Sequence, residues 1–247
     1  SIMKGYLPII LTIILISMLI FIINNTRPKI SVLILSYNRP ENLDKSLPIL
    51  NNYRLIDEII VSHGSKQHYK EFNFSKVKNI QDFENNKLYG AARRWLNIEY
   101  INNNIVLFLD DDMLPSEYLI AKSYFVLLVN YYKNTIYGTM RRNCNNAGYS
   151  FINKKTNDYD SILTPFLMCK KQLVIDYLNI NFNENKKWLI ENNGNGEDLA
   201  FNIFIRNHYN EKPLYISGNY EELNNSNGYS SMSKHYKKRN EFCKRYS

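Results

Sequence analysis

The sequence predicts an α/β fold in which a mixed, mostly parallel sheet is flanked by helices. Three short apolar runs are typical of buried strands: residues 30–35, 58–62 and 105–109. They alternate with helical patterns at residues 41–50 and 88–100, and a shorter strand is expected at residues 79–82. This order indicates parallel strands with helices on the faces of the sheet.

The pattern changes in the second half of the chain. We expect a helix at residues 116–131, antiparallel strands at 135–141 and 148–154, helices at 169–178 and 198–207, a strand at 213–217 and a basic helix from residue 233. The sequence shows no internal repeat, and 247 residues suit one α/β domain behind an N-terminal segment. We place these two parts at residues 1–26 and 27–247.

The N-terminal segment is strongly apolar. Residues 7–23 form a run interrupted only by Pro8, Thr12 and Ser17, and as a helix this run would span about 26 Å, enough for a bilayer core. A cleaved signal peptide is the alternative, but residues 22–25 offer no small-residue cleavage site. We therefore predict an uncleaved signal anchor of a single-pass, type II protein of an ER/Golgi-like or other internal membrane, although the flanking charges do not fix the orientation.

Composition narrows the function classes. The net charge of +8 comes partly from a basic C-terminus, a feature that more often marks a solvated helix face than a binding site. No zinc-ligand spacing or nucleic-acid motif accompanies this charge, so nucleic acid is not an expected partner. Cys144, Cys169 and Cys243 are too few for a disulfide framework and permit at most one bridge.

Three consecutive carboxylates, Asp110, Asp111 and Asp112, follow the apolar run at residues 105–109. Ligands bind at the carboxyl edge of open α/β sheets, and hard oxygen ligands there suit Mg²⁺ or Mn²⁺ shared with substrate phosphates. The alternative is an acidic cap on the helix expected after Pro115. One aspartate would satisfy a cap, whereas three would repel one another without a cation, so we favour a metal site.

Four ordered motifs resemble one family. The segment at residues 32–40, which contains Tyr37 and Arg39, resembles the first strand and turn of a GT-A (Rossmann-like) nucleotide-sugar glycosyltransferase, and the triple aspartate is similar to the DxD motif of that fold. The finer resemblance is to exostosin-type transferases of family 64. It rests on residues 197–202 (E-D-L-A-F-N) and on the C-terminal series of residues 227–232, His235, Arg239 and Cys243. Arg94, 16 residues before Asp110, also fits the family spacing.

The resemblance implies a role for each motif residue in donor binding. Asp112 would bind the metal directly, while Asp110 and Asp111 would hold the ribose and order the coordination shell, with Asp110 as the second candidate ligand. Arg39, in the same segment as Tyr37, would contact the base or diphosphate, and Arg94 would offer two donors to phosphate or sugar. For either arginine the alternative is an ordinary surface charge.

Asp198 and Glu197 are the candidate catalytic carboxylates, and Arg239 is the third candidate catalytic residue. In an inverting enzyme Asp198 would be the general base; in the retaining family it would face the donor sugar and stabilise an oxocarbenium-like state. The alternative for Asp198 is N-capping. Spaced i, i+4, His235 and Arg239 share a helical face and would close over the diphosphate, with a solvated basic face as the alternative.

The chain departs from the family pattern at three places. Gly196 replaces the cysteine that usually pairs with the C-terminal one, so the resemblance supplies no partner for Cys243. Ser62 and His63 stand where an asparagine often follows the second strand, and His63 is either a replacement contact or incidental. Tyr89 replaces another asparagine five residues before Arg94.

We predict a membrane-anchored glycosyltransferase that uses Mn²⁺ or Mg²⁺ and a UDP-sugar. The resemblance implies an N-acetylhexosamine donor, a glycan or glycoprotein acceptor, and retention. A nucleotidyltransferase would need a Gly-rich phosphate loop after the first strand, and residues 36–39 supply none. The remaining alternatives are an inverting family 2-like enzyme with Asp198 as base, and a non-catalytic anchored carbohydrate-binding protein.

Overall fold

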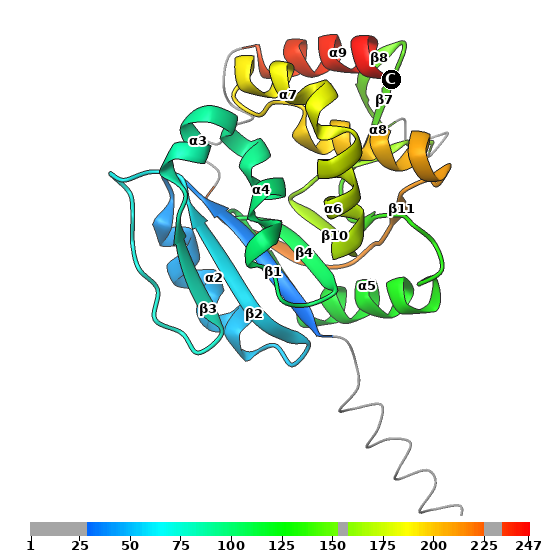
Figure 1. Ribbon diagram of the computed structural model, residues 1–247. Helices are drawn as coiled ribbons and strands as arrows, with labels where there is room; N and C mark the ends of the chain where they lie inside the picture. Colours follow the sequence, from blue (N-terminus) through cyan, green and yellow to red (C-terminus); the bar gives the residue numbers. More distant parts are fainter. Residues whose placement is uncertain (1–28, 153–157, 225–233) are drawn as a thin grey trace, which may run out of the picture.

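A central mixed sheet organises the protein. The computed structural model describes residues 29–152, 158–224 and 234–247. Its largest sheet has seven strands in the order β11-β6-β10-β4-β1-β2-β3 (Figure 1). In chain order these strands are β1 (Ile30–Ser36), β2 (Ile56–His63), β3 (Val77–Gln81), β4 (Ile105–Asp110), β6 (Tyr137–Gly138), β10 (Phe166–Lys170) and β11 (Leu214–Tyr215). The predicted α/β fold with a mixed sheet is confirmed.

The register places the ends of the parallel strands together. Val32 of β1 lies opposite Ile59 of β2 and Leu107 of β4, and all three strands run in the same direction. Strand β10 runs antiparallel to β4. Because the carboxyl ends of β1, β2 and β4 meet at one edge, the polar residues that follow them are brought into proximity.

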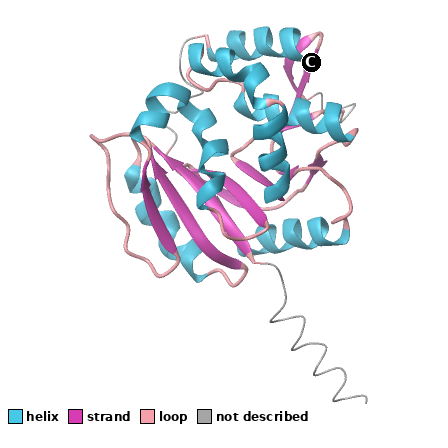
Figure 2. Ribbon diagram, in the orientation of Figure 1, coloured by secondary structure: helices cyan, strands magenta, loops and turns pink. Residues whose placement is uncertain are grey.

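Helices cover both faces of this sheet (Figure 2). Alternate residues of β1 point to opposite faces: Val32 belongs to the core under α2 (Pro40–Asn52) and α5 (Glu117–Val129), whereas Leu33 belongs to the core on the other face. The second face is covered by α4 (Arg93–Leu96), α6 (Lys171–Ile180), α7 (Phe182–Glu191) and α8 (Glu197–Tyr209). The central strands are therefore buried on both sides, which explains their unbroken apolar sequences.

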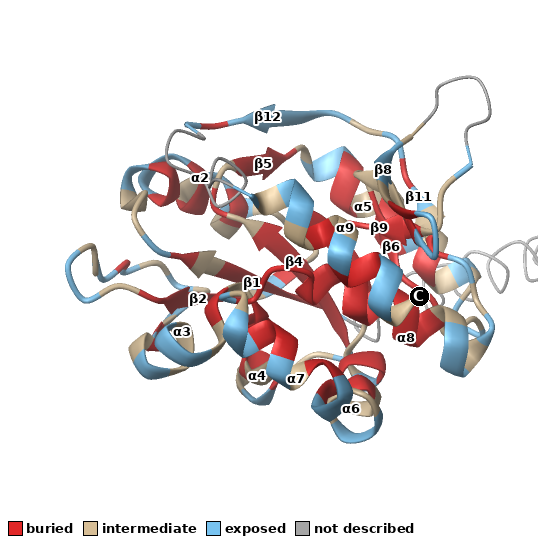
Figure 3. Ribbon diagram, turned by 90° about the horizontal axis from the view of Figure 1, so that it is seen from above, coloured by how far each residue is buried: buried red, intermediate tan, exposed pale blue. Residues whose placement is uncertain are grey.

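Two small sheets extend the fold at the carboxyl edge. Strands β7 (Arg141–Asn145), β8 (Gly148–Phe151) and β9 (Ser161–Ile162) form one sheet, and the C-terminal helix α9 (His235–Tyr246) packs against it. In the other, β12 (Tyr220–Glu222) pairs with β5 (Met113–Pro115), which directly follows the triple aspartate (Figure 3). Both the C-terminal helix and the segment at residues 220–224 thus reach the edge where β1 and β4 end.

Several local predictions are wrong. Residues 88–100 are not one helix: α3 (Phe83–Tyr89) ends at Gly90, where φ is +52°, and 3₁₀ turns then flank the short α4. The helix expected from Cys169 begins at Lys171, because residues 166–169 are buried as β10 beside β4. Residues 135–141 divide between β6 and the start of β7, and α7 was not predicted.

Some predictions fall on residues that the structure does not describe. These are the anchor at residues 1–26, the C-terminal motif at residues 227–232 and the end of the strand expected at 148–154. Across the described ranges, the structure contains no helix that is both long enough and apolar enough to span a membrane.

A disulfide joins the C-terminal helix to the small sheet. Cys243 of α9 is bonded to Cys144 of β7 with a Cα–Cα distance of 5.1 Å, and Cys169 is a buried free thiol. The prediction that the three cysteines form at most one disulfide is therefore confirmed. The partner of Cys243 is not at position 196, where Gly196 instead adopts φ +98° and lies against the ring of Phe242.

We expect Cys243→Ser to lower the free energy of unfolding by about 2–5 kcal/mol, because the bridge closes a long loop in the unfolded chain. The sequence separation of the two cysteines is 99. Denaturant titration should show the same loss for Cys144→Ser and no further loss in the double variant. Additive losses in the double variant would show that the two cysteines act independently.

Candidate active site

A cavity of about 610 Å³ opens at the carboxyl edge of the sheet. Its walls come from the ends of β1 and β4, the segment around α4, the small β7–β8 sheet, and the first residues of α8 and α9. Every side chain selected from the sequence as a site residue lines it: Tyr37, Arg39, Arg94, Asp110, Asp111, Asp112, Glu197, Asp198, His235 and Arg239. The fold thus gathers residues from across the chain into one site.

Arg39 neutralises two of the three consecutive aspartates. It precedes α2, and its Nη1 lies 3.0 Å from Asp112 Oδ2 while its Nη2 donates to Asp111. Burial lowers the pKa of Arg39, but the two carboxylates outweigh burial and leave that pKa raised. The aspartates do not cap the following helix, because Ser116 fills that role by accepting a hydrogen bond from Leu119 N at 3.2 Å. The cap alternative for this cluster is therefore wrong.

Arg94 connects the third aspartate to the candidate catalytic pair. Its Nη2 lies 3.0 Å from Asp110 Oδ1 and its Nε lies 3.6 Å from Glu197 Oε1. The side chain is almost fully buried, so it is not the surface charge considered as an alternative. Its buried Nη1 has no hydrogen-bond partner within the described parts of the chain. A buried donor on a cavity wall is suited to an anionic ligand oxygen.

Asp198 and Arg239 form a buried ion pair at the start of α8. Arg239 Nη2 lies 2.9 Å from both carboxylate oxygens of Asp198, and Leu199 N donates to Oδ1 at 2.8 Å. Gly196 is the N-cap of α8, so simple capping does not explain Asp198. Arg239 is buried, with its guanidinium carbon 4.7 Å from the centre of the Tyr149 ring. The solvated-face alternative for Arg239 is therefore also wrong.

His235 and Tyr37 complete the predicted set of site residues, with His235 partly buried and Tyr37 exposed. Burial, followed by the neighbouring Arg239, lowers the pKa of His235 to about 4, so the imidazole is neutral near pH 7. Tyr37 is 51% exposed and lies at the cavity rim, where its ring is free to contact a ligand from outside the core. Both residues line the cavity, and their roles in ligand binding stay predictions.

Two buried carboxyls have strongly raised pKa values. Burial raises the pKa of Asp111 to about 7 in spite of Arg39, with Asp112 and Asp110 adding to the increase. Burial also raises the pKa of Glu197 to about 7, and the adjacent Asp198 contributes while Arg94 opposes the shift. Buried carboxyls with raised pKa values that line one cavity are typical of a functional site.

A close contact between two loops brings Arg94 to Glu197. Gly90 and Gly194 both have positive φ, and the loop at residues 192–196 packs directly on the backbone of residues 89–92. A Cβ at Gly194 would lie 2.5 Å from Ala91 N, and one at Gly90 would lie 2.0 Å from Asn193 O. Only glycine permits this approach at either position.

Arg93, the neighbour of Arg94 in the chain, is the main site residue that was not predicted from the sequence. It is 2% exposed and donates to the carbonyl oxygens of Ser36 and Ser62, at the carboxyl ends of β1 and β2. Burial lowers its pKa to about 10, although Asp82 opposes this. Its contacts make Arg93 a link between two strand ends on the cavity wall, a role with no sequence signal beyond the arginine pair.

Other cavity residues were also missed, among them Asn86, Arg142, Tyr149, Thr164, Asn193, Glu222 and Tyr236. His63, in contrast, does not line the cavity. It is buried, its Nε2 lies 3.0 Å from Asn79 Oδ1, and its ring stacks on Phe72. Of the two interpretations of His63, the structure supports the incidental, structural one. Tyr89 lies at the end of α3, and its ring packs against Phe182.

Comparison with known families agrees with this arrangement. The model of the glycosyl transferase family 64 domain matches residues 30–247. The chain belongs to glycosyl transferase family 64. The matched region of this family 64 protein includes every cavity residue described above and excludes the N-terminal apolar run. A search of curated proteins returned no match to the chain.

Asp110 and Asp112 are the carboxylates of this family 64 transferase that could hold a divalent cation. Asp112 and Asp110 are only partly buried, and both line the cavity. No group of three or more His, Cys, Asp or Glu side chains suited to a metal ion occurs among the residues the structure describes. Mg²⁺ commonly takes one or two carboxylates and completes its shell with water and substrate phosphates. Such an ion would have to compete with Arg39 for Asp112.

The raised pKa of Glu197 predicts a pH-dependent cost of folding. The unfolded carboxyl ionises near 4.5, whereas the folded one keeps its proton up to about 7. The native state therefore loses stability as pH rises between these values. Glu197→Gln should remove this loss. As pH rises over that interval, the free energy of unfolding of the variant should therefore increase relative to that of the parent by on the order of 2 kcal/mol.

Denaturant titrations at several pH values test this expectation, with the exposed Glu84→Gln as the matched control. The Glu84 variant gives the baseline for the loss of an exposed carboxyl group. If the difference between Glu197→Gln and the parent changes with pH no more than this baseline does, Glu197 does not hold a raised pKa in the folded protein.

Proposed function

We propose that the protein transfers a sugar, an N-acetylhexosamine, from a UDP-sugar to a hydroxyl of a glycan or glycoprotein acceptor, with retention and with the help of Mn²⁺ or Mg²⁺. Membership of family 64 establishes glycosyl transfer; the donor, the metal and the stereochemistry are our inference. The observation that carries it is the convergence in one cavity of the aspartate cluster with Arg39, Arg94 and Arg239.

Donor binding uses the arginines and aspartates at the ends of β1 and β4. A bound divalent cation would neutralise charge on the departing diphosphate, with Asp112 and then Asp110 as its protein ligands. Arg39 and Arg94 supply positive charge beside it, and the unpartnered Nη1 of Arg94 is suited to a phosphate or sugar oxygen. Asp111 is buried against Arg39 and serves to hold this arginine and the ribose side of the site.

Asp198 is the group we place beside the sugar. Both of its oxygens are held by Arg239, and one also accepts a hydrogen bond from Leu199 N. A carboxylate fixed in this way is suited to stabilising the positive charge that develops on the sugar ring in the transition state. This arrangement favours the retaining role of Asp198 over proton abstraction. Glu197 lies next to Asp198 in the chain and positions Arg94.

The setting of the reaction is also part of the proposal. We infer that residues 1–26 form a signal anchor that holds the domain at an internal membrane of the ER/Golgi type, in type II orientation. The Cys144–Cys243 disulfide supports an oxidising compartment for the catalytic domain. Nucleic acid is not a proposed partner.

Asp112→Asn should abolish Mn²⁺-dependent UDP binding, because it removes the proposed direct metal ligand. The fold should persist, since Asp112 is at the cavity surface and Arg39 keeps its contact with Asp111. Isothermal titration of the full chain with UDP in the presence of Mn²⁺ measures the effect. Asp44→Asn, which removes an exposed contact to Lys70, is the control and should bind like the parent. Unchanged UDP affinity in Asp112→Asn would overturn the metal assignment.

Asp198→Asn should reduce turnover by at least roughly a hundredfold while UDP binding persists, because it removes charge that acts in the transition state. Product release assays and UDP titration on the same sample separate the two effects. Asp160→Asn is a matched control, since Asp160 pairs with Arg206 at 3.2 Å outside the cavity. If Asp198→Asn loses UDP binding and folded structure together, the carboxylate has a structural role only.

A further inference from the structure

An exposed apolar stripe runs along α5, on the far side of the molecule's functional edge. Tyr118, Phe125 and Val129 are 71%, 66% and 60% exposed, and their spacing places them on one face of the helix. Tyr131 and the 78% exposed Tyr132 continue the stripe beyond the helix end. We call these five residues the α5 stripe. Lys122 lies within it, but its ammonium turns aside to donate to the Ser217 carbonyl at 2.8 Å.

The opposite face of α5 already fills the core. Leu119, Ile120 and Leu127 are buried in the cluster beneath the sheet. The helix is therefore apolar on both faces, which is unusual for a helix at the surface of a protein surrounded by water. Large exposed apolar surfaces usually mark a contact with another molecule or with a membrane.

The α5 stripe lies at the edge of the sheet where the chain enters the described fold. Glu117 at the start of α5 accepts a hydrogen bond from Arg54 N, beside the beginning of β2, at 3.0 Å. At the other end, the Tyr131 carbonyl accepts one from Lys170 at 3.1 Å, and Lys170 lies opposite Ile105 at the beginning of β4. Ile30, the first residue of β1, pairs with this same Ile105.

Chain length ties this edge to the apolar N-terminal run. Six peptide units separate residue 23, the end of the run, from Lys29, and six units span roughly 20 Å at most. If residues 7–23 cross a bilayer, as proposed above, Lys29 must lie within that distance of the lipid surface. The amino edge of the sheet, which carries the α5 stripe, is then the part of the domain turned toward the lipid. The lipid headgroup region is the environment in which tyrosine side chains are enriched.

We propose that the α5 stripe is a membrane-contacting surface that rests on the headgroup region of the bilayer holding the anchor. The proposal depends on the signal anchor proposed above. Phe125 and Val129 bury apolar area in the interface, while Tyr118, Tyr131 and Tyr132 present apolar rings with hydroxyl groups that stay hydrated. Charge contributes little, because Lys29 is paired with Asp57 and Glu117 stands beside the stripe.

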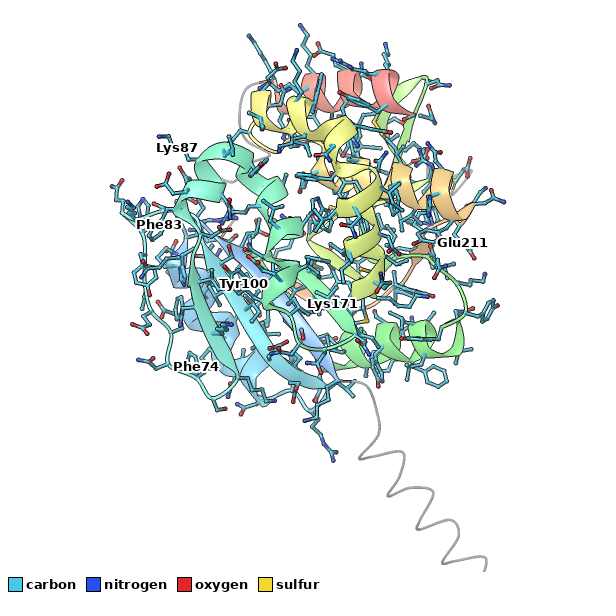
Figure 4. All side chains as sticks on the ribbon, viewed as in Figure 1. Phe74, Phe83, Lys87, Tyr100, Lys171 and Glu211 are labelled. Carbon is cyan, nitrogen blue, oxygen red and sulfur yellow. A yellow bond between two sulfur atoms is a disulfide. The ribbon has the colours of Figure 1, made fainter. Side chains whose placement is uncertain are left out.

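This contact would fix the direction in which the active site faces. The cavity lies at the carboxyl edge of the sheet, and the α5 stripe lies at the amino edge. In Figure 4, Lys87, which lines the cavity, lies well above Lys171, whose helix starts beside the amino edge. A domain resting on the α5 stripe therefore opens its cavity away from the lipid, and its acceptor arrives from the aqueous side.

Site-directed spin labelling of the full chain tests the contact. Cys144 and Cys243 are bonded and Cys169 is buried, so a cysteine introduced at the surface is the accessible thiol. Phe125→Cys and Tyr118→Cys report on the α5 stripe. Ile180→Cys, at an exposed apolar residue that ends α6, is the matched control. Each labelled chain is reconstituted in phosphatidylcholine vesicles, and its nitroxide is probed with O₂, which enters lipid, and with a nickel chelate, which stays in water.

We expect the two α5 labels to gain O₂ accessibility and lose nickel accessibility relative to the control label. Equal nickel accessibility at all three positions, in chains that float with the vesicles, would overturn the membrane contact while leaving the anchor in place. Chains that fail to float would contradict the anchor itself. Labels shielded from both probes would also overturn the proposal. Dipolar broadening of the spectra would then show that a second copy of the chain covers the stripe. Shielding without such broadening would show that another part of the same chain covers it.

Discussion

Compensation of buried negative charge is the constraint on which the rest of the site depends. Asp110, Asp111, Asp112, Glu197 and Asp198 converge on one cavity, and carboxylates removed from water need nearby cations to compensate their charge. The compensating arginines come from three distant segments: Arg39 before α2, Arg94 on α4 and Arg239 on α9. This explains why the C-terminal helix must close on the sheet edge, and why the Cys144–Cys243 bridge and the glycine contact between residues 90 and 194 matter for chemistry as well as for folding.

The same charge pairing suggests how a ligand enters. In the described structure Arg39 contacts Asp111 and Asp112, and Arg94 contacts Asp110. On the proposed function, a diphosphate with its cation would offer each group a new partner: phosphate oxygens for the arginines and the metal for the aspartates. Neither exchange is favourable alone, because removing one partner would leave a poorly compensated charge. Donor and metal should therefore bind cooperatively, each raising the affinity for the other.

The sequence predicts the centre of this fold better than its periphery. Strands β1, β2 and β4 are recognisable because they are buried on both faces and end in polar residues, and this same property located Asp110 to Asp112. Strand β10 was missed because residues 166–170 run into α6 with no Gly or Pro between them, so an apolar strand and an apolar helix start look alike. The partner of Cys243 and the burial of Arg93 are set by tertiary contacts between distant segments, which local patterns do not encode.

The most direct test of the central claim is donor hydrolysis by the full chain across a panel of UDP-, GDP- and CMP-sugars, with and without Mn²⁺. We expect release of UDP from one UDP-sugar, dependent on Mn²⁺ and absent with the other nucleotides. If hydrolysis requires an acceptor, Mn²⁺-dependent binding of UDP in the same samples is the result that we expect in its place. No binding of any nucleotide, with or without the metal, would contradict the assignment of the cavity as a donor-sugar site.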